Sequence, residues 1–210
     1  MKKAKAAAFA IVTGLMVSGC ISGKISTFPP QQDAVYVTRD GRLYTALTES
    51  YDPSDTGYNA EELKAMASEE AAGYNEVYGV EGSNEPVIIA ECMVEEGNAT
   101  IVYQYTTAED LCRFTDISQD TANHPESLVM STNSISLTEE DAQRTWTDAR
   151  KSNTTDLETV MKKKDLSMVI VTGTVTIQTE GRILYYSGAV NLKDEFTAQV
   201  TEGTAYIVFR

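Results

Sequence analysis

Runs that alternate apolar and polar residues recur along the chain, and a short segment containing glycine separates the members of each pair. The first pair, residues 34–38 and 43–47, is joined through Asp40-Gly41, a dipeptide typical of the two-residue type I′ turn. Three further pairs show the same pattern: 87–94 with 100–106, 168–178 with 182–187, and 196–201 with 204–209. Because a tight turn joins antiparallel neighbours, the pattern predicts an antiparallel sheet built from hairpins rather than parallel βαβ units.

One long stretch between the first two hairpins has helical periodicity instead. Asn59 can cap a helix with Glu62 reaching back to it, and Gly79 can end it. Apolar residues recur at three- and four-residue spacing between these points: Leu63, Met66, Ala67, Ala71, Tyr74 and Tyr78. The pattern predicts one main amphipathic helix over about 60–78.

Shorter helices are predicted at 108–114, 139–150 and 156–164, each preceded by a threonine that can cap it. The stretch 115–136 has no strong period and is predicted to be a long loop. Strands paired as hairpins, with helices set among them, predict the α+β class.

The N-terminus has the features of a bacterial lipoprotein signal. Three lysines precede an apolar run from 6 to 17, which is shorter than the roughly 20 residues needed to span a bilayer. The run ends at Gly19-Cys20, a small residue before a cysteine, as in a lipobox. Residues 1–19 are therefore predicted to be a signal peptide cleaved between Gly19 and Cys20, with the Cys20 thiol accepting a diacylglyceryl group. An ordinary secretory signal that happens to contain a cysteine is the alternative.

The mature chain is predicted to consist of a lipidated tether and a folded part. Residues 20–33 hold the lipidated cysteine and a polar segment with Pro29-Pro30, which is predicted to be a flexible tether. Residues 34–210 are predicted to form a single α+β domain. Acyl chains on Cys20 would anchor this domain to the cell membrane on its extracytoplasmic face, without spanning it.

The charge limits the partners. The 210 residues include 31 Asp and Glu against 17 Lys and Arg, for a formal net charge of -14. Cleavage before Cys20 removes three lysines and no acid, so 14 basic residues face 31 acidic ones and the mature charge becomes -17. Such a surface repels phosphate backbones, which excludes nucleic acid as a partner. The lipid is the predicted contact with the membrane, since anionic headgroups repel the domain itself.

Few residues are available for cofactor or metal chemistry. Cys92 and Cys112 could form one disulfide that closes a loop of about 20 residues, or could be two buried thiols. His124, the one histidine, precedes Pro125 in a polar stretch and is predicted to be a solvated loop residue. No metal, cofactor or catalytic motif is recognised, and the calcium-like segment 52–57 lacks its final glutamate because Leu63 stands there.

Several segments resemble uncharacterised surface lipoproteins of clostridia-like Gram-positive anaerobes. The segments that carry the resemblance are the lipobox, Tyr51-Asp52, 60–63, 73–75, 183–190 and 205–208. The resemblance covers about half of the mature chain. It implies a lipid-anchored protein on the outer face of the membrane, and it supplies no catalytic residues.

Two classes of function remain open. Eleven tyrosines and one tryptophan, Trp146, could form a stacking surface for a peptide or a glycan. This favours a non-enzymatic binding or envelope-assembly module whose partner is an envelope protein, a peptide or a glycan. The alternative is an extracytoplasmic hydrolase, glycan-directed for example, that uses carboxylates such as Glu95-Glu96 or Glu139-Glu140. A tyrosine-lined groove without converging acids favours the first, and two facing carboxyls in one pocket favour the second.

Overall fold

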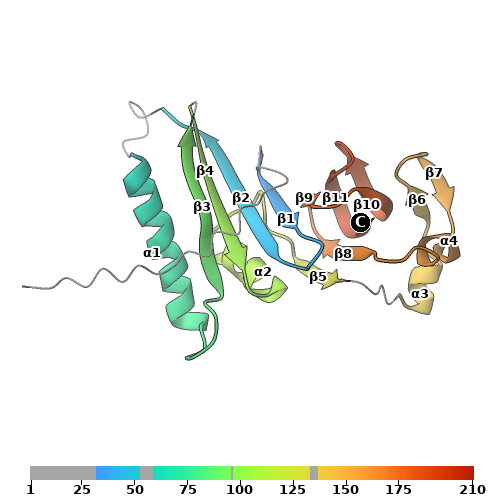
Figure 1. Cartoon of the computed structure of the whole chain (residues 1–210), viewed down its shortest axis with the longest axis horizontal. Coiled ribbons are helices and arrows are strands. Elements are labelled where there is room, and N and C mark those ends of the chain that lie inside the picture. The colour runs from blue at the N-terminus through green and yellow to red at the C-terminus, as the bar shows by residue number, and fades with distance from the viewer. Residues whose placement is uncertain (1–31, 53–58, 96, 133–136) are drawn as a thin grey trace, which may run out of the picture.

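The computed structural model describes residues 32–210 apart from 53–58, 96 and 133–136, and the side chains of Glu95, Glu139 and Ala142 are also outside its description. It confirms the α+β class. Eleven strands form one large, mostly antiparallel sheet, with the long helix at one end and two short helices at the other (Figure 1).

The first half of the sheet consists of the two hairpins that the sequence predicts. They are β1 (Ala34–Val37) with β2 (Leu43–Ser50), and β3 (Val87–Glu95) with β4 (Asn98–Tyr105), in the order β3-β4-β2-β1. The prediction of a type I′ turn at 40–41 is wrong. Gly41 alone of this turn has a positive φ, 88°, and its N–H donates to the Thr38 carbonyl at 3.1 Å. The turn is therefore a three-residue loop that ends on a left-handed glycine.

The prediction of two C-terminal hairpins is also wrong for both, 168–178 with 182–187 and 196–201 with 204–209. Residues 197–209 form one continuous strand, which makes a hairpin with the strand before it, 183–192. The strands here are β8 (Ser167–Thr172), β9 (Val175–Thr179), β10 (Ile183–Leu192) and β11 (Thr197–Phe209). β11 pairs with β10 along one edge, and with β9 and then β8 along the other.

Gly203, which the sequence places in a turn, instead lies inside β11, and Gly188 lies inside the partner strand β10. Gly188 and Gly203 both have positive φ, and the β10–β11 register shifts on either side of Ala189. A Cβ on Gly188 would lie 2.6 Å from the Thr204 carbonyl oxygen, so the two backbones approach more closely here than a side chain allows. This is the geometry of a β-bulge. The sheet also contains one parallel pair, because β9 runs alongside β1 with Val35 opposite Ile177.

Three short strands complete the sheet: β5 (Ser127–Ser131), β6 (Trp146–Asp148) and β7 (Asn153–Thr155). β5 lies inside the predicted loop 115–136 and pairs with β8. β6 lies inside the predicted helix 139–150, which is reduced to α3 (Glu139–Ala142). Pairing with β10 and burial of Trp146 outweigh helix propensity here.

The main helix has the predicted boundaries. α1 (Ala60–Tyr78) begins at a capping box, with Asn59 Oδ1 accepting from the Glu62 N–H at 3.0 Å, and ends at Gly79. α2 (Ala108–Ile117) is capped by Thr107, and α4 (Leu157–Met161) by Asp156 rather than Thr155. The side chain of Asn75 fixes α1 to β3 by accepting from the N–H of Val87 and donating to its carbonyl, at 3.0 and 2.7 Å.

The sheet divides at β11, and this creates the main core. One branch continues from β9 to β1, β2, β4 and β3, and the other from β8 to β5. Side chains of both branches and of α2 pack together between them, among them Val35, Ile177, Val171, Leu128 and Phe114. α1 covers β3 from outside through Leu63, Ala67, Ala71 and Tyr74.

A second cluster holds the end of the sheet beyond β10. Trp146 is fully buried, its ring centroid is 5.9 Å from that of Tyr206, and its indole N–H donates to the Asp141 carbonyl at 3.4 Å. The Asp141 side chain caps α3 by accepting from Thr138 and pairs with Arg144 at 3.3 Å. Burial opposes ionisation of Asp141, but hydrogen bonds from Tyr206, Thr138 and Arg144 outweigh it and hold its pKa at about 2.

We expect Asp141→Asn to lower the free energy of unfolding by about 2 kcal/mol at neutral pH. The pKa of Asp141 is lower in the folded state, so this contribution is present above the usual pKa of an aspartate. It is lost as the pH falls from about 4 towards 2. Urea unfolding of the two proteins from pH 7 to pH 2 measures the difference. A difference that does not narrow in acid, or an equal loss in Glu140→Gln on the same helix, contradicts this assignment.

Candidate functional site

An apolar groove lies between α1 and α2, at the end of the molecule where these helices flank β3 and β4. Its cavity is about 330 Å³. We call it the α1–α2 groove. Its lining includes Gly73, Tyr74, Val77 and Tyr78 of α1, and Phe114 and Ile117 of α2.

The floor of the groove is an aromatic cluster. The Phe114 ring lies 5.5 Å from that of Tyr74, 4.9 Å from that of Tyr103 and 5.8 Å from that of Tyr105. All four side chains are buried. The Phe114 ring packs against three other rings, one edge-to-face and two tilted. Such a floor is rigid, so the groove is formed before anything binds.

The tyrosine hydroxyls of the floor engage the nearby carboxylates. The Tyr74 hydroxyl donates to Asp110 Oδ1 at 3.2 Å, and the Tyr103 hydroxyl donates to Glu70 Oε2 at 2.7 Å. Burial, and then the negative charge of Asp110, raise the pKa of Tyr74 to about 12. The phenol is therefore neutral, and it fixes the carboxylate beside it. Each of the two carboxylates accepts a hydrogen bond from a different tyrosine, so they are not the converging pair of acids that a hydrolase needs.

The rim of the groove is apolar and exposed. Val77 is 69% exposed and Ile117 is 55% exposed, from opposite sides. Tyr78 is 39% exposed, and its ring lies 4.6 Å from that of Tyr74. Arg113 lies over the Tyr78 ring at 4.8 Å and pairs with Glu109. Two large apolar side chains that face water across an aromatic floor are typical of a binding surface.

Gly73 leaves the groove open in the middle of α1. A Cβ built at this position has no atom within 4 Å, so close packing does not require a glycine here. A glycine inside a helix lowers stability by about 0.5–1 kcal/mol relative to alanine. The helix therefore carries this cost at the position where a side chain would enter the groove.

The two helices that form the groove carry strong negative charge. α1 and α2 together carry eight Asp and Glu residues against one lysine and one arginine. Residues 32–131, which include both helices, contain 20 acidic and 4 basic residues, whereas residues 137–210 contain 11 and 9. The groove thus lies on the acidic end of an unevenly charged molecule.

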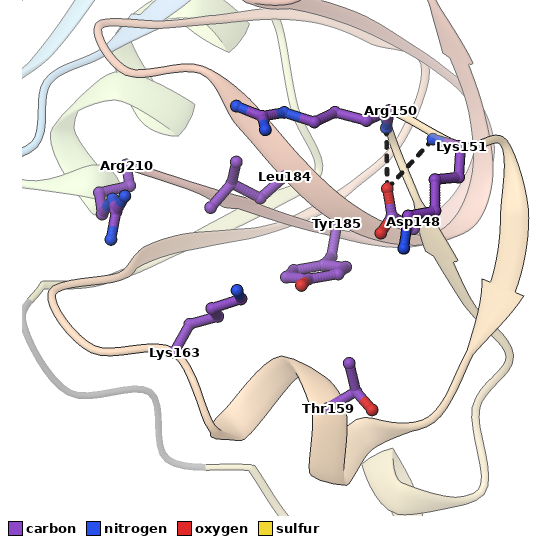
Figure 2. Close-up of a pocket in the computed structure, with 8 residues that line it drawn as sticks. All are labelled: Asp148, Arg150, Lys151, Thr159, Lys163, Leu184, Tyr185 and Arg210. Atoms are coloured by element: carbon purple, nitrogen blue, oxygen red, sulfur yellow. Dashed lines mark hydrogen bonds between the residues drawn. The ribbon is translucent and has the colours of Figure 1, made fainter.

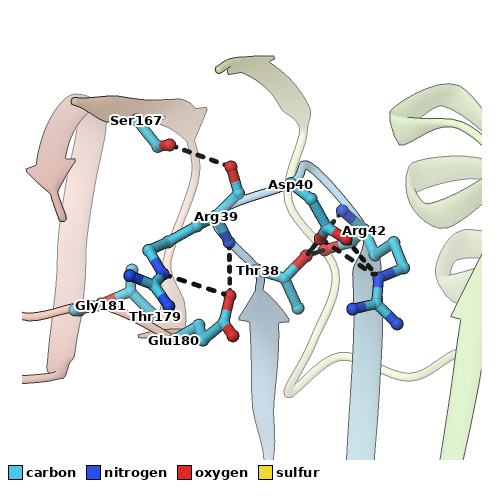
Figure 3. A network of polar contacts seen from close by, with 8 residues as sticks. All are labelled: Thr38, Arg39, Asp40, Arg42, Ser167, Thr179, Glu180 and Gly181. Carbon is cyan, nitrogen blue, oxygen red and sulfur yellow. Dashed lines mark hydrogen bonds and ion pairs between the residues drawn. The ribbon is translucent and has the colours of Figure 1, made fainter. Parts of the chain in front are cut away.

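Another hollow, at the β1–β2 turn, contains two carboxylates that are already paired, Asp40 and Glu180 (Figure 3). Glu180 Oε2 accepts from the Arg39 N–H at 2.8 Å and is 3.7 Å from its guanidinium. Asp40 pairs with Arg42 at 3.0 Å, and the hydrogen bond from Thr38 is the main reason that its pKa is lowered. A general acid of a glycosidase needs a raised pKa, so this arrangement does not favour hydrolysis.

Asp120 is the one carboxyl of the described residues whose pKa is raised, and burial is the cause. It accepts from Asn123 Nδ2 at 2.9 Å, and the same amide group donates to the Ala46 carbonyl. This pair joins the segment after α2 to β2. The neighbouring His124 is half-buried with its ring 3.1 Å from Thr115 Oγ1, so its prediction as a solvated residue is wrong.

The two cysteines of the folded part occur as free thiols. Cys92 on β3 packs with the small cluster of Tyr51, Leu63 and Ala99, whereas Cys112 on α2 packs against the main core. Burial raises the pKa of both thiols. Both are therefore less reactive than an exposed cysteine.

We expect iodoacetamide to alkylate both Cys92 and Cys112 when protein kept without reductant is unfolded in guanidinium. In the folded protein, the raised pKa values make the same reaction slow. Peptide mass spectrometry with and without prior reduction measures this. A linked Cys92–Cys112 peptide in the unreduced sample would show that the two cysteines form a disulfide and would contradict this prediction.

The remaining predicted site residues lie outside the described residues or away from the groove. Gly19 and Cys20 precede the described residues, and so does the predicted lipobox. Trp146 is buried in the second cluster and is not available for stacking. Within the described ranges, no three His, Cys, Asp or Glu side chains are grouped as metal ligands, and no helix is long and apolar enough to cross a membrane.

The groove could have been found only in part from the sequence. The predicted apolar stripe of α1 includes Tyr74 and Tyr78, but it places Tyr78 in the core. The signal that was available lies at the end of the helix, where Val77 adds a further apolar side chain beside Tyr74 and Tyr78.

Comparisons of the chain with protein-family models, with curated proteins and with solved structures gave no match. The resemblance to surface lipoproteins therefore stays a prediction, and what this chain binds has to be inferred from its own geometry and charge.

Proposed function

We propose that this chain is a lipid-anchored extracytoplasmic binding protein, and that its α1–α2 groove binds a cationic peptide segment with apolar side chains. The observation that carries the proposal is the open aromatic groove itself. It has two exposed apolar rims, a preformed floor and an acidic surround.

The size and chemistry of the groove suit one or two side chains of a peptide. A cavity of about 330 Å³ is small for a whole ligand, but it accommodates an aromatic or aliphatic anchor. The carboxylates of α1 and α2 favour lysine and arginine beside that anchor, since complementary charge speeds encounter and rejects acidic partners. A glycan would also stack on the aromatic floor, but the carboxylates of α1 and α2 contribute no electrostatic attraction to a neutral sugar.

The hydrolase alternative lacks a comparable observation. Glu95, Glu96 and Glu139 lie outside the described side chains, and the groove lining contains one carboxylate, Glu70, which accepts the Tyr103 hydroxyl.

Fluorescence anisotropy with a labelled peptide of lysine and phenylalanine tests the groove. We expect Val77→Ser/Ile117→Ser to weaken binding about tenfold or more, because two apolar contacts are lost. Met66→Ser/Val129→Ser is the matched control, since these side chains are 59% and 57% exposed outside the groove. Equal affinity of the two double variants, or tighter binding of a peptide with glutamate in place of lysine, would contradict the proposal.

The anchor has its own test. We expect Cys20→Ala to remain unlipidated, because the thioether cannot form, and to leave the membrane fraction. Intact mass and fractionation of cells measure both effects. Retention of the lipid mass together with membrane partitioning would refute the anchor without affecting the groove.

A further inference from the structure

A second cavity, also of about 330 Å³, lies at the opposite end of the molecule from the α1–α2 groove, between the β6–β7 turn, α4 and β10 (Figures 1 and 2). We call it the basic pocket. Four cationic side chains from three parts of the chain line it: Arg150, Lys151, Lys163 and Arg210. A concentration of positive charge is unexpected on a chain with a net charge of -14.

None of these four cations pairs with a carboxylate among the described residues. Six other described arginines and lysines form ion pairs, including Lys162, which follows α4 and pairs with Glu158 at 3.0 Å. None of the four that line the basic pocket does so anywhere in the described ranges. All four are exposed, so their charge is available to a ligand.

One carboxylate, Asp148, belongs to the lining and serves to shape it. Its Oδ1 accepts from the backbone N–H groups of Arg150 and Lys151, at 3.0 and 3.1 Å (Figure 2). The Asp148 carbonyl also accepts from the Ser152 N–H at 2.8 Å. Asp148 thus holds the tight turn that presents the two cations, and four positive charges face one negative charge.

The floor and the far side of the pocket are fixed. Tyr185 is buried and Leu184 is half-buried, and Figure 2 shows Arg150, Lys163 and Arg210 around these two side chains. Reciprocal backbone hydrogen bonds with Arg182, at 3.0 and 3.1 Å, hold Arg210 in place. Thr159 of α4 adds a hydroxyl to the lining.

We propose that the basic pocket binds a phosphate ester group, with Leu184 and Tyr185 packing against the apolar part of the ligand. Two guanidinium groups match the paired oxygens of phosphate, and two ammonium groups add point charges. The volume is at the lower end of the range for small-molecule sites, and it suits a group the size of a sugar phosphate or a glycerophosphate. The pocket lies on the part of the chain, 137–210, in which acidic and basic residues nearly balance, so the approach of an anion is opposed least there.

A phosphate ester can come from a free solute or from a lipid headgroup, and two assays separate these sources. The full chain with Cys20→Ala is titrated with inorganic phosphate and with glycerol 3-phosphate by calorimetry. The same protein is sedimented with vesicles of phosphatidylcholine, with and without phosphatidylglycerol. Binding of the soluble esters identifies a free ligand, and binding to the anionic vesicles alone identifies a headgroup. Either result supports the pocket, provided that it depends on the residues lining it.

Arg150→Gln/Lys163→Gln removes two of the four cations and is expected to weaken binding about tenfold or more. Lys64→Gln/Lys193→Gln changes the net charge equally outside the pocket and is expected to bind like the parent. Thermal unfolding by circular dichroism confirms that both variants fold. The proposal is overturned if the parent binds neither phosphate esters nor anionic vesicles, or if the two double variants lose affinity equally.

Discussion

Gly73→Trp is expected to weaken binding of the lysine–phenylalanine peptide about thirtyfold or more, while the protein stays folded. The position faces open space within the α1–α2 groove, so an indole there occupies the volume that a peptide anchor needs. Loss of one buried aromatic anchor costs about 2 kcal/mol or more, which corresponds to this change in affinity. Anisotropy titration gives the affinity, and urea unfolding gives the stability.

Gly73→Ala is the matched control because it changes the helix without filling the groove. We expect it to raise the free energy of unfolding by about 0.5–1 kcal/mol, since alanine is the better helix former and a methyl group meets no atom. Its affinity should fall only slightly. If Gly73→Trp binds the peptide as tightly as the parent does, the peptide does not occupy the groove.

Trp146→Ala is expected to lower the free energy of unfolding by about 3–5 kcal/mol, a large share of the total for a domain of this size. The side chain is fully buried, and it joins α3 to β11 through Asp141 and Tyr206. Its removal leaves a cavity and an unpaired carbonyl. Chemical denaturation monitored by circular dichroism measures the effect.

Trp146→Phe separates packing from hydrogen bonding. It keeps an aromatic ring near Tyr206 and loses the indole N–H, so we expect a smaller loss than for alanine. Because the α1–α2 groove is built from other elements, folded Trp146→Phe should bind the peptide as the parent does. A Trp146→Ala protein as stable as the parent would show that this cluster does not hold the end of the sheet.

Local signals in the sequence predicted the first half of the fold well. The capping box at Asn59, the three- and four-residue spacing and Gly79 give the boundaries of α1, and the glycine turns at Gly41 and Gly97 give two hairpins. In each case the deciding interactions lie within a few residues of one another. Short-range periodicity and turn chemistry are sufficient to detect such interactions.

The second half was predicted less well because its pairing is long-range. Gly203 looks like a turn residue in the sequence, but β11 continues through it because β10 pairs with β11 on both sides of this glycine, at Glu202 and at Tyr206. Likewise, β6 interrupts the predicted helix 139–150 because β10 lies beside it, with Tyr186 opposite Thr147. Neither partner can be read from a local window, and a left-handed glycine fits a turn and a bulge equally well.

The two cavities depend on the same long-range arrangement. Tyr74, Val77 and Ile117 form a groove because α1 and α2 flank the same strands, and Arg210 joins Arg150 and Lys163 because β10, β11 and α4 meet. The sequence shows tyrosines and a lysine run, but not which of them face one hollow. The uneven charge, however, can be read directly from the sequence, and it favours opposite ligands at the two ends.

The most direct measurement is a titration of the isotope-labelled full chain, carrying Cys20→Ala, with the lysine–phenylalanine peptide, followed by backbone amide chemical shifts. Binding in the α1–α2 groove predicts saturable shifts at Gly73, Val77, Ile117 and Ser118, which line it. It also predicts that these shifts weaken as salt is raised, because part of the attraction is electrostatic. Absence of shifts at these amides, or saturable shifts centred on Arg150 and Lys163 instead, would contradict the account.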